Sequence, residues 1–158
     1  MSNQSGKQFR ILLAVDLEQG MTRLVAEVER YARALDAVVD VLHVSDPDPF
    51  IGYIKSDDPA EQDVIDSGRM PRAQELRAEH QATREVGEAL RQKGVTVDQT
   101  LTVQGPILAT ILDQATRSEA DLLMLGVHHH GALYRLWHGD TATGAAAEAP
   151  CAVLLIPV

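Results

Sequence analysis

The chain has 158 residues, which is enough for one well-buried core and too few for two ordinary domains. Hydrophobic residues make up 45% and charged residues 23%, which are ordinary globular values, and no apolar run is long enough to span a bilayer. The net charge of −9, without a clustered basic face, argues against nucleic acid as a partner. We therefore predict one domain that binds neither nucleic acid nor membrane.

The start of the chain and its single cysteine bear on where the protein resides. Residues 1–8, MSNQSGKQ, lack the apolar core of a signal peptide and are predicted to be a flexible tail, so that the domain covers residues 9–158. Cys151 is the only cysteine, which excludes an intrachain disulfide, and its apolar neighbours favour an inert buried thiol. Both features favour a cytoplasmic protein.

The first half of the chain alternates apolar runs with amphipathic stretches. Phe9 to Asp16 is an apolar run that ends in an acid, and the spacing of apolar residues from Met21 to Leu35 predicts a helix. Val38 to Val44 is rich in β-branched residues and is predicted to be a second strand. Within it, we expect His43 to be buried and hydrogen-bonded.

A second helix is predicted after a long irregular segment. Ser45 to Arg69 contains several prolines, glycines and aspartates, which indicates a long excursion or a partly disordered flap. Pro71 suits the first position of a helix, and Gly94 suits its C-terminal stop. One face of this helix is expected to carry Ala73, Leu76, His80, Thr83, Gly87 and Leu90.

The second half continues the alternation. Val95 to Val103 alternates apolar and polar residues, broken only at Gln99, which predicts an edge strand with one wet face. Gly105-Pro106 opens a helix, and the continuous apolar run Leu122 to Leu125 predicts a strand covered on both faces. The chain closes with a weak helix, from about Thr141 to Ala149, and a strand over residues 151–157.

This order of elements predicts an α/β fold. We expect an open five-stranded, mainly parallel sheet in the flavodoxin-like or Rossmann-like strand order 3-2-1-4-5, with helices on both faces. The first and fourth strands are then neighbours, and ligands bind at their carboxyl ends. Asp16 and Gly126 lie at those ends. A glycine there allows a sharp turn and lets a ligand approach the main chain.

A loop rich in histidine and glycine follows Gly126. Asp140 and Thr141 precede an Ala-rich segment, so a helix N-terminus with free N–H groups is expected to face this loop. The run from His128 to His130 has no His-x-x-x-His spacing and no cysteine, so no built metal site is expected. Asp16 has no nucleophile elbow, P-loop or Ser/His/Asp arrangement beside it, and we expect no catalytic residue.

Four pieces of sequence carry a resemblance to a known family: ILLAVD, VLHV, QGPILATILDQATRSEADLLMLG and EAPCAVLLIPV. Their order and spacing resemble the universal stress protein family from Phe9 to Val158, and the resemblance implies the same open α/β sheet. The ATP-binding members share a motif of Gly, two residues, Gly, nine residues, Gly, then Ser or Thr. Here Gly126 and Gly139 match, whereas His129 and Asp140 stand at the other two positions.

These departures disfavour a triphosphate. The imidazole of His129 crowds the backbone approach, and a carboxylate near phosphate costs roughly 1 to 4 kcal/mol at the effective dielectric of a partly exposed site. Asp140 is suited instead to cap the following helix. Protonated histidines of the loop would attract an anion, so AMP or adenosine is less disfavoured than ATP.

The resemblance also implies which residues would contact a nucleotide. Asp16 and Val44 match positions that contact adenine, and Leu125 and Gly126 match positions that line the ribose. The complete set implied for an adenine nucleotide is Asp16, Val44, Leu125, Gly126, His129, Gly139, Asp140 and Thr141. Two functions stay open: a non-enzymatic stress-response module with a weakened or absent ATP site, and an adenine-nucleotide switch with at most weak hydrolase activity.

The last strand is apolar and is predicted to form an edge of the sheet. In the resembled family this strand pairs with its symmetry mate, which implies a two-fold homodimer. The residues of this dimer edge would be Ala152, Val153, Leu154, Leu155 and Ile156. A further protein partner is expected, and the sequence does not name it.

Overall fold

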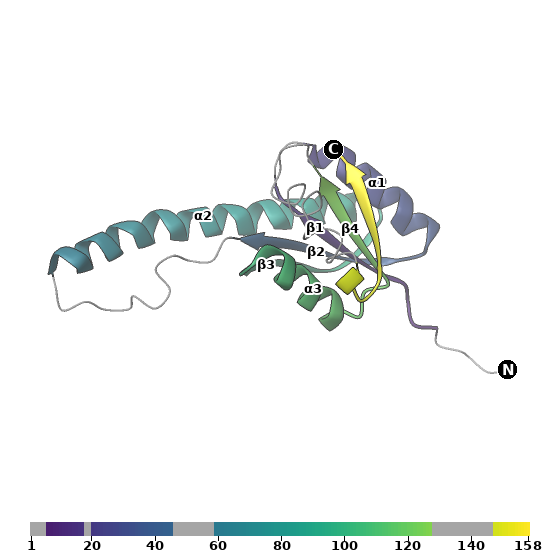
Figure 1. The fold of residues 1–158 in the computed structure, drawn as a ribbon. Helices are drawn as coiled ribbons and strands as arrows, with labels where there is room; N and C mark the ends of the chain where they lie inside the picture. The colour runs from purple at the N-terminus through teal and green to yellow at the C-terminus, as the bar shows by residue number, and fades with distance from the viewer. Residues whose placement is uncertain (1–5, 18–19, 46–58, 128–146) are drawn as a thin grey trace.

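A computed structural model describes residues 6–17, 20–45, 59–127 and 147–158. Within them, five parallel strands form one sheet in the order β3-β2-β1-β4-β5, which confirms the predicted α/β class and strand order (Figure 1). Among the helices of these residues, none has the length and apolar character that a membrane crossing needs. The elements are β1 (Arg10–Val15), α1 (Met21–Ala34), β2 (Val38–Ser45), α2 (Pro59–Gln92), β3 (Thr96–Gln104), α3 (Ile107–Arg117), β4 (Leu122–Val127) and β5 (Ala152–Pro157).

The core has two layers because side chains alternate between the two faces of each strand. Ile11, Leu13 and Val15 of β1 pack with α1 and α2 on one face. Leu12 and Ala14 pack with α3 on the other. Helices therefore cover both faces, as the alternation of strands and helices predicts.

The second helix is longer than the sequence predicts. α2 begins at Pro59, so the expectation of an irregular segment up to Arg69 is wrong for residues 59–69, and Pro71 lies inside the helix rather than at its start. A proline removes one backbone hydrogen bond from a helix interior, at a cost of about 3 kcal/mol. The flanking Ala, Glu, Gln and Arg residues are strong helix formers, and the helix continues through the proline. Residues 46–58 of the predicted flap lie outside the described residues.

This length makes α2 project past the sheet. At 1.5 Å per residue its 34 residues span about 51 Å, whereas the 9 residues of β3 span roughly 30 Å. Figure 1 shows the first part of α2 extending beyond the strands. Its end is as predicted, because Gly94 has a left-handed φ of 80° and closes the turn after the helix.

The edge strand β3 contains the irregularity that the sequence indicates. Val39 pairs with Val97, but Val41 pairs with Thr100, so β3 has one extra residue in this interval. The interval contains Gln99, where the alternation breaks. Because of this extra residue, Val97 packs on the face covered by α1 and α2, whereas Leu101 packs on the face covered by α3, although both have odd numbers. Asp98 lies beside Arg10.

Candidate functional site

The carboxyl ends of β1, β2 and β4 bring together the described part of the predicted site. Val15 pairs with His43 and Ala14 pairs with Leu125. Asp16, one residue beyond β1, therefore lies at the level of Val44 on one side and just past Gly126 on the other. The sequence predicts Asp16 and Gly126 at neighbouring strand ends, and the strand order agrees; that they bind a ligand stays a prediction.

His43 fixes the backbone beside Asp16. Its ring is 8% exposed, and its Nδ1–H donates to the carbonyl oxygen of Val15 at 2.9 Å. The expectation of a buried, hydrogen-bonded histidine is confirmed. The chain then turns sharply at Leu17, whose φ of 63° is in the left-handed region that non-glycine residues seldom adopt. Asp16 thus lies between a backbone carbonyl that is bonded to His43 and a sharp turn at Leu17.

A polar cluster anchors α2 to the end of β2. The hydroxyl of Ser45, which is 1% exposed, donates to a carboxylate oxygen of Glu79 and accepts from Arg72 Nη2 at 2.7 Å. Arg72 Nη1 lies 3.8 Å from the other carboxylate oxygen of Glu79. Thr83 Oγ1 donates to the backbone carbonyl of Glu79 at 2.7 Å, and Thr102 Oγ1 of β3 donates to Thr83 Oγ1 at 3.1 Å.

Sequence reasoning missed most of this cluster and assigned the inner face of α2 slightly wrongly. His80 is exposed, whereas Glu79 is half-buried toward the sheet. Glu79 is three residues after Leu76 and four before Thr83, so helical spacing alone would have placed it on the inner face. The charge of Glu79 argued against burial, but its contacts with Ser45 and Arg72, together with His43 Nε2 at 3.9 Å from Glu79 Oε2, offset the cost of burying a carboxylate.

Gly126 has a packing role in this structure. It lies within β4, and its φ is outside the left-handed region in which Gly20 and Gly94 lie. A Cβ atom at Gly126 would approach Leu24 Cδ2 to 2.8 Å, and Leu24, a residue of α1, is fully buried. The expectation of a sharp turn at Gly126 is therefore wrong, and the close approach of α1 is sufficient to require a glycine here.

We expect Gly126→Ala to destabilise the fold by about 1–3 kcal/mol, because the added methyl group would overpack the core against Leu24. Chemical denaturation would measure this loss. Gly6→Ala is the control, since no heavy atom lies within 4 Å of a Cβ built at Gly6. Adding Leu24→Val should recover part of the loss, and equal losses with and without it would show that the contact with Leu24 is not the cause.

The histidine loop lies outside the described residues. His129, Gly139, Asp140 and Thr141, and the predicted helix up to residue 146, therefore stay predictions from sequence. In the part of the chain that the structure describes, no group of His, Cys, Asp or Glu side chains could hold a metal ion. Cys151 is half-buried, and burial raises the pKa of its thiol, which opposes formation of a reactive thiolate.

At the amino ends of the strands, the Arg10 side chain forms ion pairs with two carboxylates. Its Nη1 lies 2.8 Å from Asp40 Oδ2, and its Nη2 lies 2.7 Å from Asp98 Oδ2. Asp40 is only 2% exposed. Burial raises the pKa of Asp40, although the nearby charge of Arg10 acts to lower it. Arg10, Asp40 and Asp98 therefore form a charged cluster near the amino ends of the strands, at the opposite end of β2 from His43 and Ser45.

Comparisons with known proteins agree with this fold. The sequence profile of the universal stress protein family matches residues 9–157. A protein of Thermus aquaticus, described as "Universal stress protein in QAH/OAS sulfhydrylase 3'region", is 32% identical over 147 residues, covering 92% of this chain and 96% of that protein.

Solved structures extend the comparison to three dimensions. A universal stress protein in complex with cAMP matches with a TM-score of 0.60 and 15% identity, covering 96% of this chain and 98% of that one. The universal stress protein from Archaeoglobus fulgidus in complex with dAMP matches with a TM-score of 0.58 and 19% identity, covering 94% and 97%. At these identities the structural likeness concerns the fold.

Proposed function

The chain belongs to the universal stress protein family, and we propose that it acts as a homodimeric, non-enzymatic stress-response module in the cytoplasm with a weakened ATP site. Support for this proposal comes from two parts of the predicted site. Asp16 and Val44 directly follow the paired residues Val15 and His43 at the carboxyl ends of β1 and β2, whereas His129 and Asp140 occupy positions where the family motif has Gly and Ser or Thr. The adenine half is kept and the phosphate half is altered.

The described residues also support a function without catalysis. Ser45 is buried, and its hydroxyl is held between Glu79 and Arg72, so it is not presented to a substrate. His43 is buried, with its Nδ1–H on the carbonyl of Val15 and its Nε2 3.9 Å from Glu79 Oε2, and the pKa of the Cys151 thiol is raised by burial. Neither side chain is placed as the base or the nucleophile that covalent catalysis requires.

A second candidate function is favoured by the assembled adenine half. It is a switch that binds an adenine nucleotide with fewer phosphates than ATP. The contacting residues would be the eight that the family resemblance implies, of which Asp16 is the first and Thr141 the last. Two proteins of the same fold have been solved with cAMP and with dAMP, each of which carries one phosphate. A single phosphate reduces the repulsion from Asp140, because fewer like charges meet it.

Isothermal titration of the purified protein with ATP, ADP and AMP separates the two functions. Extraction and mass spectrometry would first establish whether a nucleotide co-purifies. A weakened site predicts no ATP binding at micromolar strength. Micromolar AMP binding together with weak ATP binding would favour the switch. Micromolar ATP binding would contradict the weakened site and show that the histidine loop replaces the missing glycine and hydroxyl.

The homodimer is proposed from the open edge of β5. Within the described residues β5 pairs with β4 alone, and Leu155 exposes 39% of its surface there. An apolar edge strand favours pairing with another strand, and a two-fold axis would place the same strand of a second copy beside it.

We expect Leu155→Lys to convert the dimer to a monomer, because it would place two like charges near each other across the two-fold axis. Analytical ultracentrifugation would measure the mass. Leu35→Lys is the matched control, since Leu35 is also 39% exposed but lies after α1. A wild-type chain that sediments as a monomer would refute the proposed dimer.

A further inference from the structure

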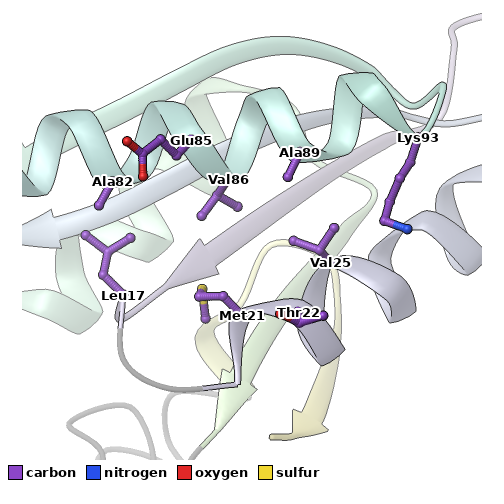
Figure 2. A pocket seen from close by; sticks show the side chains of 9 residues that line it. All are labelled: Leu17, Met21, Thr22, Val25, Ala82, Glu85, Val86, Ala89 and Lys93. Carbon is purple, nitrogen blue, oxygen red and sulfur yellow. The ribbon is translucent and has the colours of Figure 1, made fainter.

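An apolar groove runs between α1 and α2, on the face of the sheet opposite α3. Its volume is about 340 Å³, within the usual range of small-molecule sites. It is lined by Leu17, Met21, Thr22, Val25, Ala82, Glu85, Val86, Ala89 and Lys93 (Figure 2). Neither Asp16 nor Val44 belongs to this lining, although Leu17, the residue after Asp16, does.

The groove exists because α2 presents short side chains to α1. Ala82 and Ala89 lie one turn to either side of Val86 on this face of α2, and their methyl groups leave space that longer side chains would fill. Val86 and Val25 form the floor, with only 7% and 5% of their surfaces exposed. Leu17 and Met21 also pack against the core. The groove is thus an extension of the core that no described side chain fills.

Charge distinguishes one end of the groove. Figure 2 shows Leu17 at one end and Lys93 at the other, with the Lys93 side chain reaching from the end of α2 toward α1. Lys93 Nζ lies 3.2 Å from a carboxylate oxygen of Glu29, and Arg33 Nη2 lies 3.0 Å from the other. Two cationic side chains therefore share one carboxylate, which leaves an excess of positive charge for a second anion.

We propose that this groove binds a medium-chain carboxylate, with its alkyl chain along Val25, Val86 and Met21 and its carboxylate at Lys93. The lining offers an alkyl chain apolar contact over roughly 16 Å of α2, from Ala82 to Lys93 at 1.5 Å per residue. Among the described residues of the lining, those with polar side chains are Thr22, Glu85 and Lys93. The ammonium group of Lys93 attracts an anion, whereas the carboxylate of Glu85 repels one. The carboxylate of the ligand should therefore lie at Lys93, with the alkyl chain pointing toward Leu17.

Titration of the full chain with octanoate, decanoate and dodecanoate, below their micelle concentrations, tests the proposal. Affinity should rise by up to about fourfold for each added methylene group. Lys93→Met should weaken decanoate binding by about twofold to fivefold, as expected for an exposed ion pair, and leave decanol binding unchanged.

A filled groove provides the decisive variant. Ala89→Leu should abolish decanoate binding while the protein stays folded by circular dichroism. Ala78→Leu adds the same side chain at an exposed position of α2 and should bind like the wild type. Absence of decanoate binding, or binding that Ala89→Leu leaves intact, overturns the site. Equal affinity for decanoate and decanol would show that the ligand need not be an anion. If the wild type binds no decanoate and Ala89→Leu changes the oligomeric state, the groove is instead a contact with a second copy of this chain. None of these outcomes depends on nucleotide binding.

Discussion

Replacing Arg10 with methionine should destabilise the protein by about 3–5 kcal/mol at neutral pH, because it would leave a buried carboxylate without its cation. Asp40 is 2% exposed, and its Oδ2 lies 2.8 Å from Arg10 Nη1. Asp98 is the other partner of Arg10, but 44% of its side chain is exposed, so water can replace the contact there. Urea denaturation would measure the change, and the loss should be traced to Asp40.

The pH dependence of this loss follows from the pKa of Asp40. Burial holds that pKa above its ordinary value already in the wild type, and removal of Arg10 should raise it further. A carboxyl group with a raised pKa in the folded state destabilises that state as pH rises from the unfolded pKa through the folded one. The deficit of Arg10→Met should therefore be smallest near the ordinary aspartate pKa of about 4 and grow toward neutrality.

Two further variants assign the effect to charge. Adding Asp40→Asn to Arg10→Met should recover most of the stability, because the buried charge is then absent. Lys7→Met removes another cation at the same edge, but its partners Glu119 and Asp121 are partly exposed, so the change should stay within about 0.5 kcal/mol. A deficit of Arg10→Met that is equal at pH 4 and pH 7 would instead indicate lost packing of the arginine stem.

The double substitution His129→Gly with Asp140→Ser should create or strengthen ATP binding. It restores the family motif at the two positions where this chain departs from it. Removing one like charge near the phosphates recovers roughly 1–4 kcal/mol, which corresponds to a gain in affinity between about fivefold and several hundredfold. Isothermal titration at pH 8, above the ordinary histidine pKa of about 6.5, would measure the gain.

Controls separate the local repulsion from the overall charge. Asp113→Ser removes the same charge from an exposed position of α3 and should leave ATP binding as it is in the wild type. If the double variant binds ATP no better than the wild type, His129 and Asp140 do not explain the weakened site. In that case the proposed difference between the two halves of the site would have to be abandoned.

Local patterns in the sequence were enough for the fold, because each strand and helix is encoded by its own periodicity. The continuous apolar runs at β1 and β4 predict buried parallel strands, and the broken alternation at Gln99 coincides with the bulge in β3. The same patterns place Asp16 and Gly126 at neighbouring strand ends, and the family resemblance adds Val44. The family motif then identifies the loop residues, which lie outside the described part of the chain.

Tertiary contacts decided what local patterns could not. Proline favours the first position of a helix, so the sequence predicts that the second helix starts at Pro71. In the structure Pro71 lies within α2, because helix formation is cooperative along the whole helix and one unfavourable residue does not end it. The charge of Glu79 predicts exposure, but Ser45 of β2, which is distant in sequence, and Arg72, two turns earlier on α2, stabilise it in a half-buried position.

By itself, the sequence determined the α/β class and the strand order, which follow from periodicity, a property of neighbouring residues. The adenine-contacting positions and the two departures from the ATP motif come from the family resemblance and stay predictions. The packing role of Gly126 against Leu24, the pairing of Arg10 with Asp40 and the groove between α1 and α2 were decided by the tertiary structure. Each depends on the distance between residues far apart in the chain, which is fixed only when the helices pack on the sheet.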